Sequence, residues 1–229
     1  MNIRLILQQL RSSFTNSAGT IVFGMEDGTV SIFGLIFGVA ATTSDTKTVL
    51  IAGASGAIAA AVSMMAGAYL DVETTRDESD ASRSSLYAAT GSAMALSDRL
   101  ARAGLTSEQS NALTVAVQND PNAINGLVAA LDGAPKRTLD PLEQALWMLF
   151  ADFLAAAVPI LPFVFLPIFQ ARIVSGAVTV ALLIALGFGR SRIGNRSSLR
   201  TVVETVSIGI AAALAGIAIG VLIDRWFTG

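Results

Sequence analysis

Residues 205–223 read TVSIGIAAALAGIAIGVLI, nineteen consecutive residues without one charged side chain. A helix that crosses a bilayer needs about 20 predominantly apolar residues, because a charge near the bilayer centre costs a few kcal/mol or more. This stretch therefore predicts a transmembrane helix, and it sets the class of fold for the whole chain.

Four further stretches lack Asp, Glu, Lys and Arg over a similar length, at residues 28–44, 48–70, 153–171 and 173–189. We expect the third to begin near Leu142, ahead of Asp152, which would place that carboxylate inside the membrane. The sequence thus predicts an all-α, polytopic membrane protein with five transmembrane helices. It divides into an N-terminal region (1–70), a small helical cytoplasmic segment (71–141) and a C-terminal region (142–229).

The composition supports a membrane protein and removes several kinds of chemistry. Of the 229 residues, 53% are hydrophobic and 14% charged, against about 25% charged in soluble domains. The absence of cysteine and histidine excludes thiol nucleophiles, imidazole bases and nearly all zinc geometries. A formal charge of −2 gives no basic field for a nucleic acid. Carboxylates, amides, hydroxyls and methionine sulfur remain as metal ligands.

Basic residues predict the orientation, because loops on the cytoplasmic side carry an excess of Lys and Arg. With a cytoplasmic N-terminus, twelve of the fifteen basic residues lie inside, and the five spans then put the C-terminus outside. The three outside are Lys47, Arg172 and Arg225. The loop before the last span is the strongest local signal, with Arg190, Arg192, Arg196 and Arg200 and no acid.

Two regions flank the spans on the cytoplasmic side. Near the N-terminus, Ile3, Ile6, Leu7 and Leu10 share one helical face, which predicts a short interfacial helix before span 1 rather than a signal peptide. The polar segment carries helix signals: Gly104 as a stop, a Thr106–Gln109 capping box, and two Asp-Pro starts at residues 120–121 and 140–141.

Two groups of residues are candidates for metal chemistry. Glu26 and Asp27 lie where span 1 enters the membrane, and carboxylates there are costly unless they face a cavity or bind something. They could also simply mark a helix N-terminus, where acids are favoured. Met64, Met65 and Asp71 lie at the cytoplasmic end of span 2, although methionine in a membrane helix is usually a packing residue.

Four stretches, in order along the chain, resemble the vacuolar iron transporter family. They are GMEDGTVSIFGLIFGV (24–39), SMMAGAYLDVETTRD (63–77), LDPLEQAL with AVPILPF (139–163), and GRSRIGNRSSLRTVVETVSIGIAAAL (189–214). The resemblance covers nearly the whole chain and includes the expected number of spans.

The resemblance implies a homodimer that exports ferrous or similar divalent ions, such as Mn²⁺, from the cytosol in exchange for protons. By motif, Asp27 and Met64 would line the transport path, with Glu26 and Met65 beside them. Carboxylate oxygen with a thioether suits Fe²⁺ better than Ca²⁺ or Mg²⁺. The ion would be a substrate, with no permanently bound cofactor, and the protein would not be an enzyme. We expect a bacterial cytoplasmic membrane as its location.

One departure from the family concerns the segment between spans 2 and 3. Family members typically carry a glutamate-rich platform there that collects metal, but in this chain the segment has few glutamates. Either the ion enters through the acidic cluster, or the substrate differs. That cluster consists of Asp71, Glu73, Asp77, Glu78 and Asp80, and it could equally be a solvated helix face.

Asp152 is not part of the family pattern. A lone acid inside a membrane is a functional-site candidate, and its natural role would be proton coupling. It could instead pair with Arg172 or with a polar group of a neighbouring helix. For Glu204 a structural ion pair with Arg200, four residues earlier, is expected.

Two GxxxG motifs, Gly34 with Gly38 and Gly216 with Gly220, offer flat surfaces for close helix packing. We call them the glycine steps. They fit a dimer without establishing one. Alternatives to metal transport are a non-transporting membrane scaffold or partner protein of the same fold, and a transporter of another substrate. An intramembrane aspartyl protease built on Asp27 and Asp152 lacks the necessary motifs.

Overall fold

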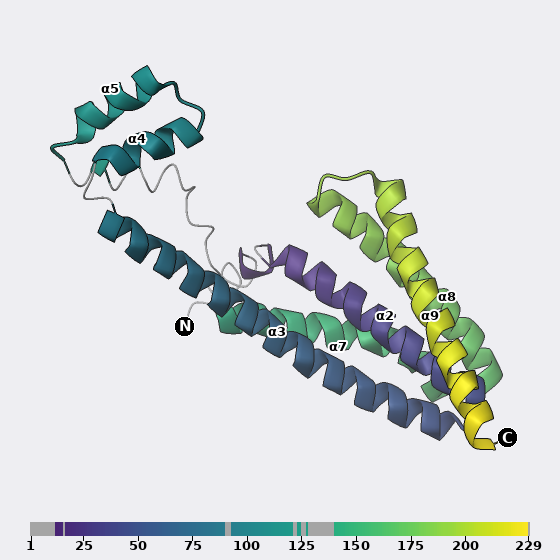
Figure 1. Ribbon diagram of the computed structural model, residues 1–229. Helices are drawn as coiled ribbons and strands as arrows, with labels where there is room; N and C mark the ends of the chain where they lie inside the picture. The colour runs from purple at the N-terminus through teal and green to yellow at the C-terminus, as the bar shows by residue number, and fades with distance from the viewer. Residues whose placement is uncertain are drawn as a thin grey trace, which may run out of the picture. The chain divides into compact units, whose positions relative to one another are not determined.

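The computed structural model describes residues 12–15, 17–89, 93–120, 123, 124, 127 and 140–228, and every regular element in these ranges is helical (Figure 1). Within this part of the chain, five helices are long and apolar enough to cross a membrane, which confirms the predicted fold class. They are α2 (Ala18–Thr42), α3 (Thr46–Ala89), α7 (Pro141–Phe165), α8 (Ile168–Ile193) and α9 (Ser198–Thr228). The predicted interfacial helix at Ile3–Leu10 lies outside the described residues.

The chain divides into two compact units, one formed by residues 1–70 and 139–229 and the other by residues 71–138. In the second unit α4 (Ala93–Arg102) packs on α5 (Ser107–Val117) around Leu96 and Leu100. Two of the predicted helix signals are confirmed here, and the start at residues 140–141 is confirmed by the Asp140 cap of α7; Pro121 lies outside the described residues. Gly104 follows α4 with a φ of +97°, and the Thr106 and Gln109 side chains form a capping box at the start of α5.

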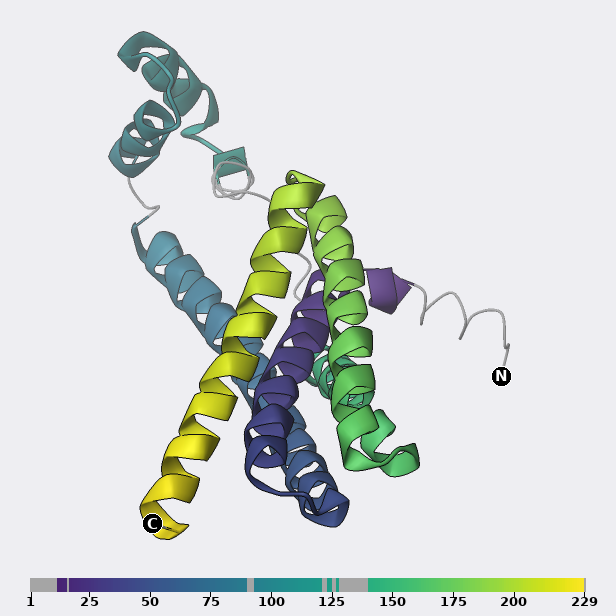
Figure 2. The same cartoon turned by 90° about the vertical axis from the view of Figure 1, so that its right-hand side faces the viewer.

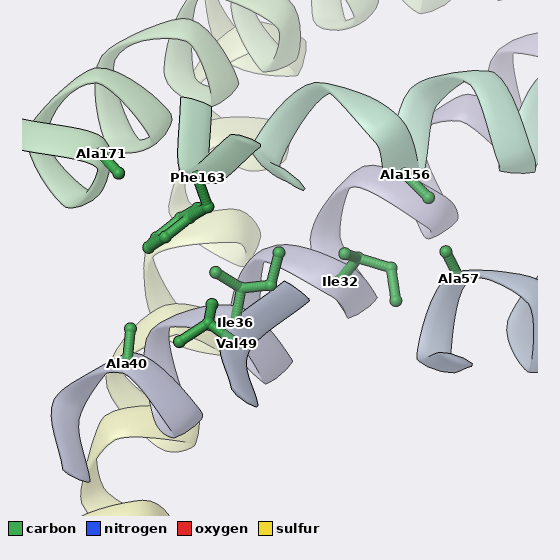
Figure 3. Close-up of a cluster of buried hydrophobic side chains, with 8 residues drawn as sticks. All are labelled: Ile32, Ile36, Ala40, Val49, Ala57, Ala156, Phe163 and Ala171. Carbon is green, nitrogen blue, oxygen red and sulfur yellow. The ribbon is translucent and has the colours of Figure 1, made fainter. Parts of the chain in front are cut away.

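In the first unit, α2 is the central helix. It packs along α7 and α9 and also contacts α8, as the two views in Figures 1 and 2 show. Figure 3 shows the core beside it, where Phe163 of α7 lies near Ile36, and Ala57 of α3 faces Ala156 of α7. The core cluster thus includes side chains from α2, α3 and α7.

The two predicted glycine steps pack against each other within one chain. A β-carbon built on Gly38 of α2 would lie 2.7 Å from the carbonyl oxygen of Gly216 of α9, and one built on Gly220 would meet the carbonyl of Gly38. The steps therefore join α2 to α9. A dimer would have to use other surfaces.

Two span boundaries differ from the sequence prediction. Helix α2 begins at Ala18, ahead of Phe23, where the sequence places the opening of span 1. Span 3 was expected to end at Ala171, but α7 ends at Phe165 and α8 begins right after Pro167. The helix is continuous through Pro159 and Pro162, and the Ser175 hydroxyl of α8 donates to the Pro159 carbonyl over 2.7 Å.

Arg172 lies in the first turns of α8, not in a loop. Its guanidinium donates to the carbonyl oxygens of Ala40 and Thr43, the latter over 3.0 Å, at the C-terminal end of α2. A cation there complements the unpaired helix carbonyls. Arg172 therefore fixes α8 to α2, and its pairing with Asp152, which was one alternative, is wrong.

The short turn between α2 and α3 is closed by Asp45. Its carboxylate accepts hydrogen bonds from the Thr48 hydroxyl over 2.6 Å and from the backbone N–H groups of Lys47 and Thr48 over 3.1 Å each. These bonds, the Thr48 hydroxyl foremost, lower the pKa of the Asp45 carboxyl below its ordinary value. Asp45 thus acts as the cap of α3.

Candidate functional site

Glu26 and Asp27 lie well inside α2, two turns after its start at Ala18. The alternative that these acids merely mark a helix N-terminus is therefore wrong. Both line a cavity of about 520 Å³ between α2, α8 and α9. The rest of the lining combines apolar side chains with three polar ones, and it consists of Gly19, Val22, Phe23, Val30, Arg190, Ile193, Gly194, Arg196, Thr205 and Ile208.

Glu26 is already engaged by the protein. Its Oε2 lies 3.4 Å from the Arg190 Nη1 and its Oε1 accepts a hydrogen bond from the Thr205 hydroxyl over 3.0 Å. The Glu26 side chain is only 13% exposed. This carboxylate therefore connects α2 to the end of α8 and the start of α9.

Asp27 differs from its neighbour. Within the described part of the chain no hydrogen bond or ion pair engages its carboxylate, and it remains partly exposed to the cavity. A carboxylate with free lone pairs in a membrane-level cavity is available to a cation. Of the two acids that the sequence predicts at this position, Asp27 is the one free to bind.

Asp152 lies in the contact between α7 and α2. It is fully buried, and a β-carbon built on Gly28 of α2 would lie 2.8 Å from the Asp152 Oδ1. Gly28 directly follows Asp27, so Asp152 packs against the same turn of α2 that carries Asp27. The structure therefore brings together Asp27 and Asp152, which lie 125 residues apart along the chain.

Met64 and Met65 lie on α3, and both are half-buried. They share a helical stripe with the buried Ala57, Ala61 and Ala68, and Ala57 faces α7 in Figure 3. Met64 and Met65 therefore lie on the buried side of α3. Neither methionine lines the cavity that holds Asp27.

The predicted cytoplasmic cluster belongs to the second unit. Its acids Asp71, Glu73, Asp77 and Glu78 are exposed along α3, and the side chain of Asp80 lies outside the described part. Among the described residues, no three acidic side chains come together as a metal site. Glu204 is paired with Arg200 over 3.1 Å, which confirms the structural role expected of it.

Sequence reasoning missed three contributors to this region. Arg190 was counted only as a signal of orientation, and Thr205 was not singled out, because nothing local indicates that they meet Glu26. Met148 of α7 is buried, and a β-carbon on Gly24 of α2 would lie 2.6 Å from its Sδ. Its spacing of four residues from Asp152 was a signal that the sequence did contain.

The Glu26–Arg190 pair is expected to hold α8 against α2. Arg190→Gln should lower the free energy of unfolding by about 1 kcal/mol, between the values of exposed and buried ion pairs. Thermal unfolding of the purified protein in detergent measures this. The control is Arg200→Gln, since Arg200 is 83% exposed in its pair and its loss should change little. Equal effects of the two variants would contradict the role of Arg190.

Fold and site together define a membrane protein with five candidate membrane-spanning helices and a free carboxylate in a cavity between three of them. A sequence model of the VIT family matches residues 18–221, and the chain belongs to that family. It is 25% identical over 227 residues to vacuolar iron transporter 1 of Eucalyptus grandis, covering 93% of this chain and 89% of the relative. It is 24% identical over 216 residues to vacuolar iron transporter 1 of Arabidopsis thaliana, covering 90% and 85% respectively.

Proposed function

We propose that this protein transports divalent metal ions across a membrane and that Asp27 binds the ion on its path. The observation that carries the proposal is the free Asp27 carboxylate in its cavity, in a chain whose relatives are named iron transporters. A carboxylate at this depth is costly unless a cation compensates it. Membership of a transporter family also favours transport over catalysis.

The finer features follow the sequence prediction. The ion is Fe²⁺ or the similar Mn²⁺, since a transport path that offers the Asp27 carboxylate and, outside its cavity, the Met64 thioether suits a borderline metal. Met65 and Glu26 would assist, the latter only after release from Arg190, and the acids at 71–78 would form the cytoplasmic entrance. Export from the cytosol would be coupled to protons, with Asp152 as the coupling candidate.

The assembly and orientation are part of the same proposal. The protein would be a homodimer with its N-terminus in the cytoplasm and its C-terminus outside, and a bacterial cytoplasmic membrane stays the expected location. Large apolar side chains are exposed on α3 and α9, such as Ile58, Val62 and Leu214. These surfaces would face lipid or the second copy, since the glycine steps are used within the chain.

A second candidate function is that of a non-transporting membrane scaffold of the same fold. One observation favours it: among the described residues, no cluster of three acids could collect metal in the segment between α3 and α7. This candidate predicts a folded protein that moves no ion.

Flux into proteoliposomes separates the two. We expect uptake of Fe²⁺ and Mn²⁺ by the purified full chain, and we expect a pH gradient across the membrane to accelerate it several-fold. Co²⁺ and Zn²⁺ measured alongside define the selectivity. Uptake at the same rate with and without the gradient would contradict proton coupling and leave metal transport standing. No uptake of any ion by well-folded protein would reject transport and favour the scaffold.

A further inference from the structure

A methionine and an aspartate lie on the same face of α7, one turn apart. Met148 and Asp152 are four residues apart, which places their β-carbons about 5–6 Å from each other on a helix. The Met148 side chain is 5% exposed and Asp152 is 0% exposed. Both meet glycines of α2, Met148 at Gly24 and Asp152 at Gly28, so the absence of side chains on α2 leaves room for them.

The Asp152 carboxyl has no partner in the described part of the chain. Both of its oxygen atoms are buried without a hydrogen bond. Burying a carboxylate without compensation is very costly, and buried charges in proteins are normally paired or coordinate a metal. We therefore expect the partner of this carboxyl to come from outside the polypeptide.

Among the described residues of the helices packed against α7, no basic side chain pairs with Asp152. On α2 the charged neighbours are Asp27, which has the same sign, and Glu26, which is paired with Arg190. On α8, Arg172 donates to the carbonyls at the far end of α2. The part of α3 before Leu70 carries a single charge, Lys47 in its first turn.

We infer that Met148 and Asp152 form a second divalent-cation site, in the contact between α7 and α2 and next to Asp27. The inference rests on the proposed metal transport and extends it. A carboxylate oxygen beside a thioether favours a borderline ion such as Fe²⁺ or Co²⁺ over Mg²⁺ or Ca²⁺. Neither residue lines the cavity that holds Asp27, so this site is separate from the one at Asp27.

Metal binding to the purified full chain tests the site, with Co²⁺ as the probe in equilibrium dialysis. We expect two ions per wild-type chain and one in Asp152→Asn. Met148→Leu keeps the size of the side chain and removes only the sulfur. It should lower the affinity for the second ion at least tenfold, because losing even an outer-shell partner of a bound metal costs about 10–100-fold. Glu204→Gln, which alters an exposed ion pair, serves as the control and should still bind two.

Thermal unfolding gives a readout that does not depend on counting ions. Asp152→Asn should unfold at a higher temperature than wild type without metal, because it removes an uncompensated buried charge. Saturating Co²⁺ should raise the unfolding temperature of wild type more than that of the variant, because a bound ligand stabilises the native state. An Asp152→Asn variant that fails to fold leaves Met148→Leu to decide.

The outcomes separate this inference from the proposed function. One wild-type ion, lost in Asp27→Asn but kept in Asp152→Asn and Met148→Leu, overturns the second site and leaves transport through Asp27 standing. One ion lost in all three variants also overturns a separate site. Loss of the second ion in Asp152→Asn with normal binding in Met148→Leu overturns the two-donor site, because Asp152 would then hold that ion without Met148. No binding by any folded variant rejects both proposals.

Discussion

Asp27→Asn is expected to lower metal uptake into proteoliposomes by about 100-fold or more while the protein folds and inserts normally. Asparagine has nearly the same shape but lacks the negative charge, so the ion loses its strongest ligand in the cavity. Changes in residues that only support a metal ligand already cost about 10–100-fold in affinity or activity, and the loss of a ligand itself should cost at least as much.

The stability of this variant should be unchanged or slightly raised. Asp27 has no hydrogen bond or ion pair within the described residues, so the amide removes no protein contact. It also removes repulsion between Asp27 and Asp152. The elution profile in size-exclusion chromatography and the unfolding temperature check this, and they separate loss of transport from loss of fold.

Glu204→Gln is the matched control for Asp27→Asn. Glu204 is also a carboxylate near the start of a long membrane helix, but its side chain is 40% exposed and paired with Arg200. Its variant should transport like the wild type. Normal transport by Asp27→Asn would sink the assignment of Asp27, and an equal loss in both variants would indicate a general effect of removing charge.

The number of spans could be predicted from the sequence because it depends on a local property. A membrane helix needs a long apolar stretch with few charges, and each of the five helices contains one. Their ends were harder to predict. Helix α2 continues through Glu26 because Arg190, 164 residues away in the sequence, compensates that charge, and no local pattern reveals such a partner.

The candidate site was predicted in part for the same reason. Residue type and depth were enough to single out Asp27 and Asp152, because any acid inside a membrane calls for an explanation. That they approach each other follows from the packing of Gly28 on α7, which is a tertiary contact. The glycine steps show the same limit. The sequence indicates that each step offers a flat surface for helix packing, but it does not indicate that the two steps pack against each other.

Gly216→Ala is expected to destabilise the protein by about 2 kcal/mol. Alanine favours a helix over glycine by about 1 kcal/mol, but here its β-carbon would overlap the carbonyl oxygen of Gly34 in α2. Overpacking typically costs about 1–3 kcal/mol, and a backbone atom, unlike a side chain, cannot rotate away. We expect the cost of this overlap to exceed the gain in helix preference, and we expect α9 to move outward from α2.

Gly67→Ala provides the opposite case on another membrane helix. No atom lies within 4 Å of a β-carbon built on Gly67, so only the helix preference remains and the variant should gain up to about 1 kcal/mol. Thermal unfolding in detergent should therefore rank Gly67→Ala above wild type and Gly216→Ala below it. Equal shifts would contradict the close α2–α9 contact. Because Thr205 lies on the same helix as Gly216, a displaced α9 should also release Glu26, and Gly216→Ala should alter metal binding at the neighbouring Asp27.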